Sequence, residues 1–181
     1  MGNVAKRVST STPARGVGDE TGSISFLYET DRFVIATWKG IGIHIWARQG
    51  TPPLVQKVDE YNTEFLKLHP RGIASLHVIT KNAPPPDENT RILFKKLTKK
   101  FSKDLSCICN VVEGSGFWAG ALHAFLTGLH WISRESHDYL ICATVPEASA
   151  WVAETHSKWV GEPVAADELE EAVKKVRQRI E

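Results

Sequence analysis

Residues 105–145 read LSCICNVVEGSGFWAGALHAFLTGLHWISRESHDYLICATV. Both ends of this stretch are apolar and rich in Cys, Ile and Val, which is typical of strands buried inside a sheet. Between them, the turn residues Gly114, Ser115 and Gly116 open an apolar segment of helical length. A strand, a helix and a second strand in this order predict two parallel strands joined by a right-handed crossover.

The chain before this stretch repeats the alternation. Pro52 and Pro53 suit the first turn of a helix, and apolar residues recur every three to four positions over 54–68. A short apolar strand follows at 73–80. Asp87 favours the start of a second helix over 88–103, since an acid stabilises a helix N-terminus.

Two β-rich runs, 24–29 and 32–38, precede these units. The polar break Thr30-Asp31 between them predicts a hairpin of antiparallel strands. The segment from Gly40 to Gly50 alternates like a strand, yet its glycines also suit a helix start or a loop, so both alternatives stay open.

The end of the chain adds a helix over 148–160 and a strongly charged helix over 166–181. The predicted order is β-β-α-β-α-β-α-β-α plus a C-terminal helix, in a mostly parallel sheet whose first strand is antiparallel. This is an α/β fold with one domain over 23–160 and a C-terminal helical segment over 161–181. Residues 1–22 contain almost no large apolar side chains, so we expect a disordered tail there.

The composition is that of an average globular protein. The chain has 181 residues, 22 Lys+Arg and 21 Asp+Glu, and this near-neutral balance argues against broad nucleic-acid binding. No apolar run has the length of a transmembrane segment, and the N-terminus has no secretory signal, so we expect a cytoplasmic protein. The three cysteines are expected to be reduced and buried.

The sequence resembles the STAS domain, the fold of bacterial anti-sigma-factor antagonists, over about 24–160. The element order carries this resemblance. The stretches VVEGSGFWAGALHAFLTGLHWI and YLICATVPEASAWV also look like the C-terminal half of uncharacterised bacterial STAS-like proteins.

The resemblance implies a site for phosphorylation of Ser or Thr after the middle strand. The matching stretch IASLHVITKNAPPPDENT offers Thr80 at the strand end, but it lacks the D-x-S pattern of the antagonists and carries a Pro triplet. The resemblance also implies protein docking, and some related domains bind nucleotides or lipids.

Two features suggest a surface for a protein partner. The helix over 88–103 carries six cations, which also suit the solvated face of an ordinary helix. Trp46 and Trp118 lie beside glycine-rich junctions, where an exposed tryptophan can act in binding. The predicted partner surface consists of Arg91, Lys95, Lys96, Lys99, Lys100, Lys103, Trp46 and Trp118.

A ligand of an open α/β sheet normally binds at the carboxyl ends of the parallel strands. The backbone N–H groups of a glycine turn there can bind an anion, although simple turn chemistry is the favoured explanation of the glycines. The predicted ligand-binding residues are Lys39, Gly40, Thr80, Lys81, Gly114, Ser115 and Gly116.

No pattern predicts a metal site, a cofactor or catalysis. His123 and His130 lie about 10 Å apart along one helix, too far to share an ion alone. Cys107 and Cys109 alternate on a strand, which favours small buried side chains over ligands. Ser115 has no G-x-S-x-G motif around it.

We therefore expect a non-enzymatic regulatory or adaptor module that acts by protein–protein contact and requires no cofactor. The partner is an unidentified protein, or a second copy in a homo-oligomer. A small-ligand-binding protein, for a nucleotide or a lipid, is the alternative. Strands added in chain order also leave one face of the sheet to be covered by the tail, the terminal helix or a partner.

Overall fold

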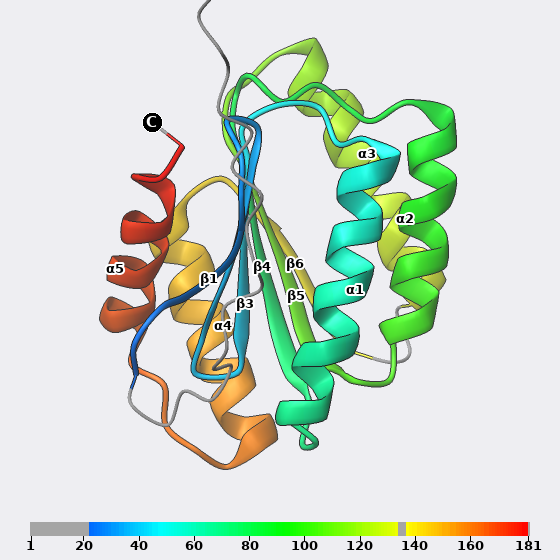
Figure 1. Ribbon diagram of the computed structural model, residues 1–181. Coiled ribbons are helices and arrows are strands. Elements are labelled where there is room, and N and C mark those ends of the chain that lie inside the picture. Colours follow the sequence, from blue (N-terminus) through cyan, green and yellow to red (C-terminus); the bar gives the residue numbers. More distant parts are fainter. Residues whose placement is uncertain (1–21, 134–136, 181) are drawn as a thin grey trace, which may run out of the picture.

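A six-stranded sheet between two layers of helices makes up the described part of the chain, residues 22–133 and 137–180 of the computed structural model (Figure 1). The first two strands each pair antiparallel with the next, and the last four are mutually parallel. In order across the sheet, the strands are β1 (Ser25–Glu29), β2 (Phe33–Trp38), β3 (Ile41–Trp46), β4 (Ile73–Ile79), β5 (Leu105–Val112) and β6 (Asp138–Cys142). The predicted α/β class is confirmed, whereas the expected tail falls almost entirely outside the described residues.

The helices divide between the two faces of the sheet. One face carries α1 (Pro52–Leu68), α2 (Glu88–Phe101) and α3 (Phe117–Ser133), and the other carries α4 (Val145–Val160) and α5 (Ala166–Arg177) (Figure 1). The first three helices connect neighbouring parallel strands, so right-handed crossovers place them on one side. The face that the sequence left uncovered is thus covered by α4 and the C-terminal helix.

Strand β3 occupies the segment whose structure the sequence left open. Lys39 and Gly40 both have positive φ angles, of 46° and 75°. Two such residues make the two-residue turn that matches the twist of a hairpin. The chain therefore reverses directly from β2 into β3, and β3 is the antiparallel partner of β2 and the parallel partner of β4.

The two faces of the sheet differ in chemistry. The face toward α4 and α5 is apolar, with residues such as Ile43, Leu76 and Val111 fully buried. Because side chains alternate along a strand, the intervening residues point toward α1, α2 and α3. Several of these are polar, and His44, Ser75 and Asn110 are each less than 5% exposed. The polar groups therefore lie beneath the three-helix layer.

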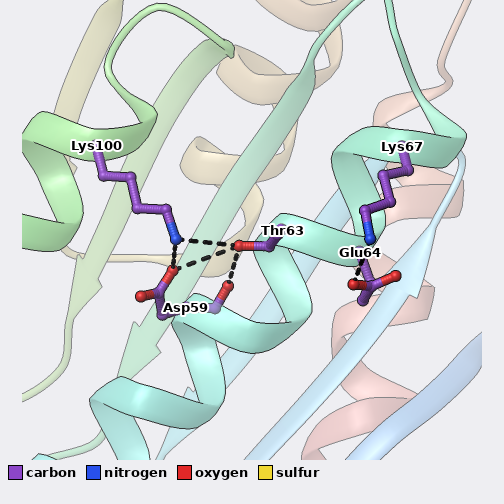
Figure 2. Close-up of polar contacts among 5 residues, drawn as sticks. All are labelled: Asp59, Thr63, Glu64, Lys67 and Lys100. Atoms are coloured by element: carbon purple, nitrogen blue, oxygen red, sulfur yellow. Dashed lines mark hydrogen bonds and ion pairs between the residues drawn. The ribbon is translucent and has the colours of Figure 1, made fainter.

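Helix α2 is the outermost helix of that layer, and its backbone contacts are chiefly with α1 and α3 rather than with the sheet (Figure 1). The Asp87 carboxylate caps its N-terminus by accepting a hydrogen bond from the Thr90 N–H at 2.8 Å. On the outer side, Lys100 of α2 pairs with Asp59 of α1 and donates to Thr63 at 3.2 Å (Figure 2). Helix α2 thus packs chiefly against α1 and α3.

Candidate functional site

A cavity of about 90 Å³ lies between the sheet and the three helices. Side chains from α2 and α3 form its apolar walls, and Trp46 and Ile79 continue the wall from the sheet. The aromatic rings of Phe94 and Phe125 meet edge to face at 6.0 Å, which closes the space between α2 and α3. Because α2 stands away from the strands, side chains do not fill the volume beneath it.

Polar side chains interrupt the apolar lining of the cavity on its sheet side, here called the floor. Ser75 and His77 on β4, Asn110 on β5 and Asn62 on α1 all line it. His77 and Asn110 are register partners on neighbouring strands, and Ser75 lies two residues before His77 on the same face. The alternation of two parallel strands therefore brings these groups together under α2.

His77 links two of its neighbours. Trp46 Nε1–H donates to His77 Nδ1 at 3.2 Å, and His77 Nε2 lies 3.0 Å from Ser75 Oγ. Burial lowers the pKa of His77 to about 4, so the ring is neutral near pH 7. Since the indole can only donate, Nδ1 is the acceptor and the proton of the neutral ring is on Nε2. His77 therefore donates to Ser75.

Two other polar groups near the floor have no partner among the described residues. Asn110 is 4% exposed, and its Nδ2 makes no hydrogen bond. His44 is 1% exposed, neither of its ring nitrogens has a partner, and its ring stacks on His77 at 4.5 Å. Burial, and to a lesser degree the neighbouring His77, hold the pKa of His44 well below its ordinary value. Buried polar groups are normally paired, so Asn110 in particular calls for an explanation.

The cavity reaches the carboxyl edge of the parallel strands. Arg48 and Gly50, which follow β3, and Pro84 and Pro86, which follow β4, line it there. Arg48 is exposed and is the only charged residue of the lining. This edge is where ligands of open α/β sheets normally enter.

A second, open cleft of about 460 Å³ lies along the same edge. Thr80 and Lys81, both predicted as ligand-binding residues, line it together with Arg48, Glu113 and Arg177. Glu113 pairs with Arg177, and the backbone of Gly114 lies against Lys81. Ser115 and Gly116 follow in the exposed turn before α3. The structure thus brings part of the predicted ligand site together.

Lys39 and Gly40 do not belong to that site, which corrects their prediction. They form the β2–β3 turn at the amino ends of the parallel strands, on the opposite edge of the sheet from Thr80. Lys39 pairs there with Glu168 of α5 at 2.6 Å. The sequence left the segment that forms β3 open. Without that strand, β2 was expected to run parallel to β4, which would have placed Lys39 and Gly40 at the carboxyl ends of the parallel strands.

The predicted partner surface is also revised. Trp46 is only 5% exposed and forms part of the cavity wall, so it is not a surface residue. Lys100 pairs with Asp59, and Arg91 donates to the Pro86 carbonyl at 2.7 Å. The other predicted cations are exposed and make no ion pair with a described residue; they are Lys95, Lys96 and Lys99 of α2, and Lys103, which follows that helix.

Helix α3 exposes three aromatic side chains. Phe117 is 80% exposed, and Trp118 and Trp131 are each 62% exposed. The helix contains no Asp, Glu, Lys or Arg from residue 117 to 133. The sequence predicted an exposed Trp118 but missed Phe117 and Trp131. The lack of any charged residue in the helix nevertheless indicated that its exposed surface is apolar.

The described residues also contain histidines, acids and buried cysteines outside the cavity. Among them, no group of three or more His, Cys, Asp or Glu side chains is placed to hold a metal ion. Cys109 and Cys142 lie 3.8 Å apart, and burial raises the pKa of the Cys107 thiol to about 12. Within the same part of the chain, no helix combines the length and apolarity needed to span a bilayer.

Comparison of the sequence and the structure with models of protein families, with curated proteins and with solved structures found no match.

Proposed function

We propose that this protein is a non-enzymatic binding protein that holds a small, mostly apolar molecule in the cavity beneath α2. The observation that carries the proposal is an apolar cavity whose floor presents a buried, unpartnered amide, Asn110. Ligand sites typically combine apolar walls with a few polar groups that orient the ligand. An unpaired buried donor is costly in the empty protein, and a ligand that pairs with it recovers that cost.

The volume limits the size of the ligand. A single water needs about 10–15 Å³, and a cavity of roughly 150 Å³ accommodates benzene. The cavity of about 90 Å³ is smaller than that, so without any movement it suits a molecule of about four heavy atoms. A larger molecule requires α2 to move outward, which its limited contact with the sheet permits.

A cavity-filling variant tests this proposal. Leu97 of α2 lines the cavity, whereas the preceding Lys96 is exposed on the same helix. Cyclopentanone is titrated into the protein and binding is followed by NMR shifts of cavity side chains. We expect binding to the unmodified protein and to the control K96W, and loss of binding in L97W. Equal binding by L97W would contradict the proposal.

A second candidate function is a regulatory or adaptor module of the STAS type, acting in the cytoplasm through protein–protein contact. The outer face of α3 favours it, because exposed aromatic residues on an uncharged helix are typical of interaction surfaces. The exposed lysines of α2 lie on the neighbouring helix and suit an acidic partner. A phosphorylation site at Thr80, beside Lys81 in the open cleft, remains a prediction.

Two surface variants separate this function from ligand binding. One carries Trp118→Glu and Trp131→Glu on α3, and the other carries Lys95→Glu, Lys96→Glu and Lys99→Glu on α2. In affinity capture from host lysate, a partner held by either surface is lost from the corresponding variant, while cyclopentanone binding is unchanged in both. A partner retained by both variants would rule out these two surfaces.

A further inference from the structure

We propose that the molecule held in the cavity is neutral and carries a carbonyl-type oxygen that accepts hydrogen bonds from Asn110 and Ser75. This inference rests on the proposed binding function. It adds the chemical class of the ligand, which the size and apolarity of the cavity alone do not define.

The direction of the hydrogen bonds on the floor is the first argument. Trp46 donates to His77, and His77 in turn donates to Ser75 Oγ. The oxygen of Ser75 is therefore used as an acceptor, and its own O–H has no acceptor among the described residues. Because the indole of Trp46 can only donate, this chain runs in one direction and ends in a donor that faces the cavity.

Asn110 supplies the second donor. Its Nδ2 has no hydrogen-bond partner in the described structure, and the residue is 4% exposed, so solvent outside the cavity does not reach it. Asn110 lies on the strand beside Ser75, about 4.8 Å away across the sheet and offset by two residues along it. Two residues that each carry a donor thus line one small cavity.

Two other polar side chains of the cavity lining are already engaged. The Tyr139 hydroxyl already donates to the Leu126 carbonyl at 3.1 Å. His77 uses both ring nitrogens in the bonds described above. An acceptor placed over β4 and β5 therefore satisfies two donors that nothing else in the described structure satisfies.

The absence of charge around the floor is the argument for a neutral ligand. Arg48 is the only charged residue of the lining and is exposed at the carboxyl edge. A cation or an anion at the floor would lose its hydration without gaining a counter-ion, which is strongly unfavourable. A ketone, ester or amide oxygen avoids that penalty and still accepts two hydrogen bonds.

A matched pair of probes tests the inference. Cyclopentanone and methylenecyclopentane have nearly the same shape, but only the ketone carries an acceptor oxygen. We expect the protein to bind the ketone about tenfold more tightly. Asn110→Leu and Ser75→Ala are each expected to remove most of that preference by weakening ketone binding alone. Ser149→Ala, in α4 on the opposite side of the sheet, is the control and should leave the preference unchanged.

The outcomes distinguish this inference from the function on which it rests. If the unmodified protein binds both probes equally, the inference is wrong while the binding function stands. If it binds neither probe, both proposals fail. If the preference survives in folded Asn110→Leu and in Ser75→Ala, the assigned donors are wrong; the second variant decides the question if the first does not fold.

Discussion

At the scale of single residues, Asn110 is a side chain that the fold itself does not require. Its buried Nδ2 has no partner in the described structure, and an unsatisfied donor costs about 1–3 kcal/mol. A residue retained at such a cost is typical of a functional position, where stability and activity are in conflict. We therefore expect Asn110→Leu to raise the free energy of unfolding by about 1 kcal/mol, measured by urea denaturation.

Ser149 of α4 provides the control for that prediction. Its buried Oγ is also unpartnered, but the residue lies on the opposite side of the sheet from the cavity. Ser149→Ala should stabilise the protein without changing ligand binding. If Asn110→Leu instead destabilises the protein, the side chain has a structural role that the hydrogen-bond pattern does not reveal.

At the scale of elements, the β2–β3 turn decides where β3 lies. Gly40 has a φ of 75°, and an added Cβ would stand 2.9 Å from His156 Nε2. A side chain at this position would be strained by the positive φ angle and would also crowd His156. We therefore expect Gly40→Ala to lower the free energy of unfolding by about 1–3 kcal/mol. The measurement is the midpoint of urea unfolding at unchanged m-value.

Gly128 of α3 is the matched control, because an added Cβ there meets nothing within 4 Å. Alanine is the better helix former, so Gly128→Ala should stabilise the protein by about 1 kcal/mol. Equal effects of the two substitutions would contradict the strain assigned to the turn.

The elements also show what the sequence could and could not predict. Long periodic helices and apolar strands were recognisable, because burial imposes their spacing on the residues. Strand β3 was not, since Gly40 and Gly42 interrupt the pattern and the turn lacks an Asn-Gly or Asp-Gly pair. The last strand ends at Cys142 rather than Val145, because Thr144 caps α4.

At the scale of the whole molecule, the cavity depends on relations between elements that local patterns do not contain. Ser75, His77 and Asn110 meet only once the register of β4 and β5 is known. The space above them exists because α2 rests on α1 and α3 rather than on the strands. The sequence could therefore indicate the carboxyl edge as a ligand site, but it could not indicate the floor beneath α2.

Buried histidines from three separate elements make the stability of the whole fold sensitive to acid. Burial holds the pKa of His44 well below its ordinary value and lowers those of His77 and His156 to about 4. Between about pH 6.5 and pH 4 the unfolded chain binds protons that the folded chain does not, so stability falls as the pH falls. Each of these histidines contributes about 1.4 kcal/mol per pH unit well inside that window.

We therefore expect the free energy of unfolding to be nearly constant between about pH 7 and pH 8 and to fall steeply below about pH 6. Urea denaturation at a series of pH values measures this slope. His156 is 1% exposed and hydrogen-bonds Ser106 at 2.8 Å, so His156→Gln should remove about a third of the three-histidine contribution to the slope. An unaltered slope in His156→Gln would show that burial does not lower the pKa of this histidine in the folded protein.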